Sequence, residues 1–333
     1  MRPKPLASEL EAVCPLCDRA HPIRLESVAC NLCGADRKEE LFWRGDLALG
    51  LGGRFRVVRC GGCGLRYLDP RPAAEDIDYY YPPSYEMHRP TPAPGTRDGY
   101  AAWRQDFCQR KRCRLVSRHR RHGRALDVGC ADGHFLRVLS RWGEWDVRGV
   151  ERAAAVAGRA RERHGLDVTT GSIAEVELPA AHFDLVTLWD VIEHLHDPRG
   201  ALERIAASLK PGGLLVLSTP VSNSLDARLF GRYWIGYEIP RHLYFFSMET
   251  LTALLAATGF KIVETRVLFG SDFALADQLR FTLRGRGAPL AVYGAASVIA
   301  RSRPWRWALA PIFKLLDLAK LTTPRTVVCV KGG

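Results

Sequence analysis

One short stretch decides the fold of this chain, and it reads Leu126-Asp127-Val128-Gly129-Cys130-Ala131-Asp132-Gly133. It begins as an apolar run and ends in a turn bounded by two glycines. From His134 to Leu139 the sequence continues with the apolar spacing of a helix. A strand, a glycine turn and a helix in that order bring backbone N–H groups close to a nucleotide. We therefore expect the first strand and helix of a nucleotide-binding α/β domain.

Downstream of this stretch, short β-rich runs alternate with helical segments. A second strand over 145–150 ends at Glu151, where an acidic group can accept hydrogen bonds from both ribose hydroxyls. Further strands are expected at 166–170, 183–189, 214–218 and 325–330, with helices up to about 164 and over 198–209. This alternation predicts a doubly wound α/β sheet.

The composition describes a folded chain of about two domains. Of its 333 residues 47% are hydrophobic and 25% are charged, with a formal net charge of +12. The 30 glycines and 20 prolines are too few and too scattered for collagen-like or low-complexity material, so disorder is excluded as the main state. The N-terminus has a basic start but no continuous apolar stretch, which predicts a cytoplasmic protein.

Six cysteines near the N-terminus form three C-x-x-C pairs: Cys14/Cys17, Cys30/Cys33 and Cys60/Cys63. In a reducing compartment this spacing favours zinc over disulfides. The second and third pairs are each followed by a glycine, so we expect them to form one structural Zn²⁺ site together. Whether the first pair binds metal is left open. Residues 1–85 are thus predicted to be a zinc-binding knuckle module, small enough to need a metal or a partner domain.

The remaining boundaries follow from composition. Residues 86–124 are expected to be a proline-rich linker and a basic helix. The basic run at 97–124 is typical of a solvated helix face, with nucleic-acid contact the minority interpretation. Residues 125–333 are expected to form the α/β domain, with a helical insertion at about 270–324. Each apolar stretch of the insertion is too short to span a bilayer. We expect these helices to pack on the sheet or in a dimer; the alternative is peripheral contact with the inner face of the membrane through 285–320.

Four features in order resemble the class I S-adenosylmethionine (SAM) dependent methyltransferases. The first is the glycine turn, which reads G-x-x-x-G and so suits a cofactor without a pyrophosphate. The others are Gly149-Val150-Glu151, then 183–186 with the run from Trp189 to Leu195, and last Leu209-Lys210-Pro211-Gly212-Gly213. The resemblance covers about residues 100–270. It implies a Rossmann-like sheet of seven strands and an enzyme that uses SAM.

Carried onto this sequence, the resemblance implies a set of cofactor-binding residues. Asp127, Gly129 and Gly133, with Cys130 in the same turn, would shape the pocket for the methionine part of SAM, and Glu151 would take the ribose. The adenine would lie near Ser172 and Ile173. Asp190, after the fourth strand, would sit where the acceptor and the sulfonium meet.

The N-terminal module is similar to the zinc-binding domain that precedes the catalytic domain in sugar methyltransferases. The run from Pro240 to Ser247 resembles a histidine-containing loop that faces the acceptor in that group. Sugar C-methyltransferases have Glu-His where this chain has Arg241-His242, which favours oxygen over carbon as the methylated atom. His242 is the preferred general base, since a neutral imidazole suits that role near pH 7; His194 is its competitor.

The sequence therefore predicts methyl transfer from SAM to a small-molecule or glycan acceptor, with a sugar hydroxyl on a nucleotide- or lipid-linked carrier as the leading candidate. One alternative is an RNA methyltransferase, but the run Trp189-Asp190-Val191-Ile192 lacks the signature for amino groups on bases. A second alternative is a non-catalytic protein that binds SAM or zinc. The oligomeric state is left open.

Overall fold

The computed structural model describes residues 9–13, 20–83, 85, 99–268, 271–301 and 303–332. Its contacts divide the chain into two compact units. The sheet unit comprises Glu86–Pro220, Leu251–Phe269 and Thr323–Gly333. The cysteine unit comprises Met1–Tyr85, Val221–Thr250 and Gly270–Thr322. Each unit is thus assembled from three separate segments.

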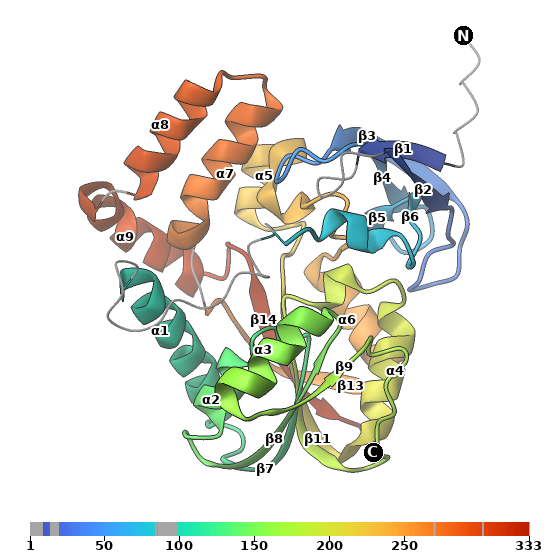
Figure 1. Ribbon diagram of the computed structural model, residues 1–333, viewed down its shortest axis with the longest axis vertical. Coiled ribbons are helices and arrows are strands. Elements are labelled where there is room, and N and C mark those ends of the chain that lie inside the picture. The colour runs from blue at the N-terminus through green and yellow to red at the C-terminus, as the bar shows by residue number, and fades with distance from the viewer. Residues whose placement is uncertain are drawn as a thin grey trace. The chain divides into compact units, whose positions relative to one another are not determined.

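The sheet unit contains a seven-stranded sheet in the order β13-β14-β11-β10-β7-β8-β9 (Figure 1). Neighbours among β7 to β11 are parallel, and β14 is antiparallel to both β11 and β13. The bounds are β7 (His122–Val128), β8 (Glu144–Glu151), β9 (Asp167–Thr170), β10 (Phe183–Trp189), β11 (Leu209–Thr219), β13 (Phe260–Arg266) and β14 (Arg325–Lys331). The predicted doubly wound α/β fold is confirmed.

Helices cover both faces of this sheet because its central strands are apolar on both sides. All seven residues of β10 are buried, as expected of a strand between two helical layers. One face packs against α1 (Gly99–Val116), α2 (His134–Leu139) and α3 (Ala154–His164), whose buried residues share a cluster with Leu185 and Val216. In Figure 1, α4 (Pro198–Ser208) and α6 (Met248–Ala257) lie on the other side of the strands.

From β7 the chain continues to β8 and β9 on one side of the sheet, and from β10 it continues to β11 on the other side. The strand order therefore reverses between the neighbours β7 and β10. In open α/β sheets ligands bind outside the carboxyl ends of the strands at such a switch point. The fold therefore points to the ends of β7, β8 and β10 as the place to look for a site.

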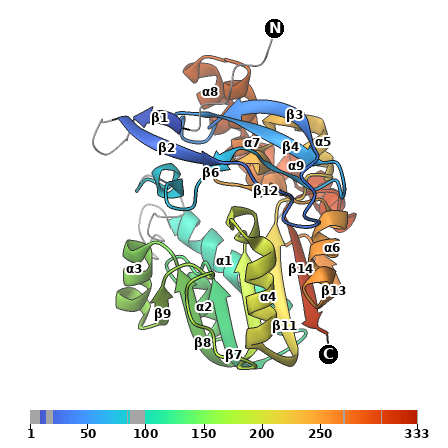
Figure 2. The ribbon, with the colours of Figure 1, turned by 90° about the vertical axis from the view of Figure 1, so that its right-hand side faces the viewer.

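The cysteine unit is built on two small sheets (Figure 2). One has the order β1-β2-β6 and the other the order β12-β5-β4-β3. The bounds are β1 (Glu9–Val13), β2 (Ala20–Glu26), β3 (Lys38–Gly45), β4 (Arg54–Cys60), β5 (Arg66–Leu68), β6 (Arg71–Pro72) and β12 (Tyr244–Phe245). Strand β12 follows the fifth strand of the large sheet in the chain, yet Tyr244 pairs with Tyr67 of β5.

Residues 221–250 also anchor in this unit through a buried ion pair. The Arg241 guanidinium lies 2.6 Å from the Asp46 carboxylate and 2.7 Å from that of Glu238. Tyr80, from η1 (Ile77–Tyr80), is buried and donates its hydroxyl hydrogen to the Gly52 carbonyl. The contacts thus group 221–250 with the cysteine module, whereas the sequence boundaries put this segment in the α/β domain.

The insertion forms three helices, α7 (Ser271–Gly285), α8 (Leu290–Arg301) and α9 (Arg303–Leu318), which the contacts also group with the cysteine unit rather than with the sheet. The Gln278 amide accepts a hydrogen bond from the Ile235 N–H and donates one to the Tyr233 carbonyl. Arg284 donates to the Leu47 and Ala48 carbonyls. Within the described part of the chain, no helix is both long and apolar enough to cross a bilayer.

Candidate functional site

Acidic side chains gather where β7, β8 and β10 end. Asp127 is the penultimate residue of β7, Glu151 is the last residue of β8, and Asp190 follows β10 directly. Because these strands are parallel neighbours, their carboxyl ends meet at one edge of the sheet. The structure therefore brings together three of the residues that the sequence predicted for the cofactor.

The turn after β7 is shaped by positive φ angles at Gly129 (69°), Ala131 (49°) and Gly133 (75°). A Cβ atom on Gly129 would come within 2.6 Å of Val191, so both the backbone and the available space require glycine there. The N–H groups of Gly129 and Cys130 donate to the Val150 carbonyl at 2.8 and 3.1 Å. The turn is thereby fixed against the end of β8. Cys130 is buried, and burial raises the pKa of its thiol, so it packs rather than reacts.

Glu151 is held rigidly by the backbone. Its Oε2 accepts from the Ala131 N–H at 3.0 Å and its Oε1 accepts from the Ala153 N–H at 2.9 Å. Each carboxylate oxygen has a second lone pair, and the side chain is partly exposed. The carboxylate can therefore accept two further hydrogen bonds from a pair of neighbouring hydroxyls.

Asp127 is buried beneath the turn. Burial raises its pKa to about 7, although the hydrogen bond from the Thr187 hydroxyl, at 2.6 Å, and the charge of Arg112 act to lower it. Nearby Glu151 raises it further. A cationic group bound at this edge of the sheet would favour the ionised form of Asp127.

Asp190 is held in the left-handed region, at φ 58°, by its own N–H, which donates to the Ser218 carbonyl at 3.0 Å. Its Oδ2 lies 3.4 Å from the Arg112 guanidinium. Its Oδ1 is buried and has no hydrogen-bond partner within the residues that the structure describes. Burial raises the pKa of Asp190, and Arg112 opposes that rise. An orphaned, buried carboxylate oxygen is suited to a donor from a ligand.

Arg112 is the site residue that the sequence did not single out. It lies on α1 and stacks over the Trp189 ring, with 4.5 Å between guanidinium carbon and ring centroid. The basic run at 97–124 was the available signal, but its spacing does not mark which arginine turns toward the sheet.

Ser172 and Ile173 lie in the loop after β9. The Ser172 hydroxyl accepts from the Ala174 N–H at 3.2 Å, and Ile173 is buried. The N–H of Gly171, just before them, donates to the Glu151 carbonyl at 3.0 Å. This loop therefore begins beside Glu151, and an adenine contact there stays a prediction.

The two candidate bases belong to different units. His194 ends η3 (Ile192–His194) in the sheet unit and is partly exposed. His242 belongs to the cysteine unit, where its Nδ1 donates to the Gly236 carbonyl at 2.8 Å. Burial, together with the positive charges of Arg241 and Arg44, lowers the pKa of His242 to about 4, although the hydrogen bond to Gly236 acts to raise it. His242 is thus neutral at pH 7, with its basic lone pair on Nε2. The catalytic role of either histidine stays a prediction.

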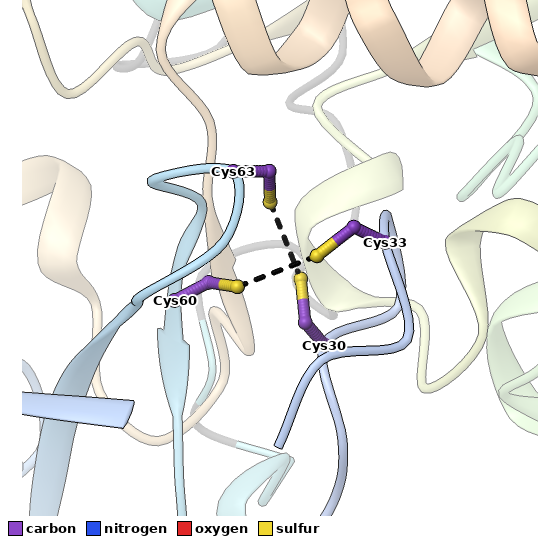
Figure 3. Close-up of side chains that lie close together, drawn as sticks. All are labelled: Cys30, Cys33, Cys60 and Cys63. Atoms are coloured by element: carbon purple, nitrogen blue, oxygen red, sulfur yellow. Dashed lines mark hydrogen bonds between the residues drawn. The ribbon is translucent and has the colours of Figure 1, made fainter. Parts of the chain in front are cut away.

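Cys30, Cys33, Cys60 and Cys63 converge in the cysteine unit (Figure 3). The sulfur atoms of Cys30 and Cys63 are 3.5 Å apart, those of Cys33 and Cys60 are 3.4 Å apart, and all four lie within 4.8 Å of one another. The predicted pairing of the two knuckles is thus observed. Cys14 and Cys17 lie outside the described residues.

The two knuckles share the same backbone hydrogen bond and the same glycine conformation. The N–H of Gly34 donates to the Cys30 carbonyl and that of Gly64 to the Cys60 carbonyl, with φ of 74° and 79° at the two glycines. Burial acts to raise the pKa of Cys60, but hydrogen bonds from the Cys63 and Gly62 N–H groups and the neighbouring thiols lower it to about 7. The four thiols are thus a donor set of the kind that binds zinc.

Comparison with known proteins identifies the sheet unit. Residues 100–265 match a family described as a methyltransferase domain. The chain is 33% identical over 162 residues to a ubiquinone biosynthesis O-methyltransferase of Bradyrhizobium diazoefficiens, covering 45% of this chain and 63% of that protein. It is 30% identical over 171 residues to the protein of the same name from Burkholderia vietnamiensis, covering 46% and 73%.

Among solved structures, a SAM-dependent methyltransferase from Mesorhizobium loti is 17% identical with a TM-score of 0.46, over 67% of this chain and 98% of that one. The chain spans 63% of the length of the first of the curated relatives. The glycine turn, Glu151 and Asp190 lie at the switch point of a sheet whose sequence matches the methyltransferase-domain family. The protein therefore belongs to the class I SAM-dependent methyltransferases.

Proposed function

We propose that this protein transfers a methyl group from SAM to a hydroxyl oxygen of a small-molecule or glycan acceptor. The observation that carries the proposal is the carboxyl edge of the sheet, where Asp127, Glu151 and Asp190 meet beside the glycine turn. The names of the similar relatives, which specify O-methyltransferases, support oxygen as the methylated atom.

The residues at this edge fit SAM. Glu151, fixed by two backbone N–H groups, would accept hydrogen bonds from the ribose hydroxyls, and the turn from Gly129 to Gly133 would pack around the amino-acid end. The orphaned Oδ1 of Asp190 is suited to the ammonium group, and Arg112 beside it to the carboxylate of the same ligand. When bound, SAM supplies the electrophilic methyl group.

The chain's own residues would mainly position the acceptor and remove its proton. Holding the acceptor oxygen in line with the methyl group converts a bimolecular step into an effectively unimolecular one. The hydroxyl must also lose a proton, and His242, neutral with its lone pair on Nε2, has the protonation state for a general base. His194 remains the alternative base.

A sugar hydroxyl on a nucleotide- or lipid-linked carrier is our specific proposal for the acceptor. It is supported by the similarity of the cysteine module to the zinc-binding domain of sugar methyltransferases. Several cations of the 97–124 run form ion pairs inside the sheet unit, for example Arg120 with Asp184 at 2.8 Å and Arg110 with Asp106 at 2.6 Å. These pairs reduce the charge that could face RNA.

We also propose that the four-cysteine cluster binds a structural zinc ion. Zn–S bonds of about 2.3 Å in a tetrahedron place the sulfur atoms about 3.8 Å apart, and the observed separations of 3.4 and 3.5 Å are close to that value. Four thiolates fill the coordination shell, which supports a role in stability rather than in catalysis.

The test is methyl transfer from labelled SAM into an extract of the source organism, separated into RNA, protein, lipid and polar small molecules. We expect label in the lipid or sugar fraction, lost with Glu151→Ala and reduced with His242→Ala. Label in RNA would refute the acceptor class. If no fraction is labelled while calorimetry detects SAM binding that Glu151→Ala abolishes, the non-catalytic alternative gains support.

A further inference from the structure

Helix α9 turns an apolar stripe toward solvent. Ile312, Leu315 and Leu318 are 54%, 68% and 69% exposed. Ala308 and Pro311, which are also exposed, complete with Ile312 and Leu315 a row at the i, i+3, i+4, i+7 spacing of one helix face. A surface helix of a globular protein normally places charged and polar residues on that face. The face therefore has the character of an interaction surface.

The other side of the same helix is apolar as well. Leu309, Phe313 and Leu316 are only partly exposed. Helix α9 is thus hydrophobic nearly all round over its described side chains. A helix of this composition is usually buried in a large core or in lipid.

Helix α8, which packs against α7 and α9, repeats the feature. Ala291, Ala295 and Val298 are exposed at the i, i+4, i+7 spacing, and Val298 is 71% exposed. In the sheet unit, by contrast, large exposed apolar residues such as Val263 on β13 occur singly among polar neighbours. Scattered residues of that kind are normal on any surface, whereas rows on adjoining helices are not.

The charged residues in the sequence of α8, α9 and their flanks are almost all basic. Residues 286–320 contain a single acidic residue, Asp317, whose carboxylate accepts a hydrogen bond from the Thr322 hydroxyl. The same span carries six basic residues: Arg286, Arg301, Arg303, Arg306, Lys314 and Lys320. Lys314 is exposed and borders the stripe of α9. An apolar stripe edged by cations is complementary to an anionic lipid surface.

We propose that α8 and α9 form a membrane-docking surface, on which the exposed stripes enter the interface of an anionic bilayer while the flanking cations contact lipid head groups. Neither helix can span the bilayer, so the contact is peripheral. A bilayer fits better than a second copy of the chain, because two copies meeting at this face would bring like charges together. The inference does not depend on the SAM site.

The test is flotation of the full-length protein with phosphatidylglycerol-containing vesicles and with phosphatidylcholine vesicles. We expect binding to the anionic vesicles that weakens with salt. Leu315→Gln should weaken partitioning roughly ten-fold, because it removes most of a leucine's burial in the interface. Lys314→Gln should weaken partitioning to anionic vesicles about five-fold.

The matched control is Val263→Gln, which changes an exposed apolar residue, 48% exposed, on the other unit. It should bind vesicles like the wild type, and circular dichroism should show all three variants folded. Binding by wild type that Leu315→Gln leaves unchanged would overturn the assignment to α9. If the wild type does not bind vesicles, the proposal is overturned. This holds also if sedimentation shows that the wild type is a dimer and that Leu315→Gln dissociates it. SAM binding, measured in parallel, should be unaffected, which separates this test from that of the proposed function.

Discussion

Replacing Arg241 by methionine should destabilise the cysteine unit by about 3–5 kcal/mol. The Arg241 and Asp46 side chains are both 0% exposed and lie 2.6 Å apart. The same guanidinium donates to Glu238 at 2.7 Å and to the Tyr80 carbonyl at 3.1 Å. Methionine fills a similar volume but leaves the Asp46 carboxylate buried without its cation. The cost is therefore mainly that of an uncompensated buried charge.

The assay is urea unfolding followed by tryptophan fluorescence, with Trp234 as a buried reporter in the same unit. The control is Arg59→Met, which breaks the Arg59–Glu39 pair. This pair has a similar separation, 2.5 Å, but its side chains are 47% and 56% exposed. Screening by water should keep its cost within about 1 kcal/mol. Equal costs for the two variants would refute the claim that burial makes the Arg241 pair important.

Four other results are expected. Burial raises the pKa of Asp127 to about 7. Between about pH 4 and pH 7 the folded state therefore holds a proton that the unfolded state has lost, so the urea midpoint should decrease as the pH rises through this range. Asp127→Asn should remove this pH dependence of the midpoint. Cys60→Ser should lower the zinc content, measured by mass spectrometry, and the thermal midpoint together; a metal-free wild type of unchanged stability would contradict the zinc site. Glu151→Gln should weaken SAM binding by calorimetry roughly ten-fold or more, since a charged acceptor becomes neutral. His242→Gln should lower methyl transfer but not SAM affinity. In the wild type kcat/KM should decline only near pH 4, where the imidazole gains its proton; a decline that Gln at position 242 leaves unchanged would contradict His242 as the base.

The parts of the fold that the sequence could predict are those encoded by neighbouring residues. The glycine turn after Val128, the acidic end of β8 at Glu151 and the apolar run of β10 each lie within one local segment. The two matching C-x-x-C-G knuckles could be predicted for the same reason, because each is a short motif of neighbouring residues. These features cover the sheet and most of the candidate cofactor site.

The features that escaped prediction depend on distant partners. Arg241 and Asp46 are 195 positions apart, and β12 is a two-residue strand with no periodic signal of its own. Arg112 is one of many cations in its segment, and only packing against Trp189 distinguishes it. Contacts of this kind form only when segments that are distant in the sequence come together in the folded chain, so no local pattern indicates them.

The interleaving of the two units has a consequence for biogenesis. A ribosome releases the cysteine knuckles first, but β5 stays without its neighbour β12 until residue 245 has emerged. The large sheet likewise waits for β14 (Arg325–Lys331), which lies between β11 and β13. Synthesis therefore exposes open strand edges for most of translation, and such edges favour aggregation. Production of this protein in cells should accordingly depend on chaperones that hold nascent chains.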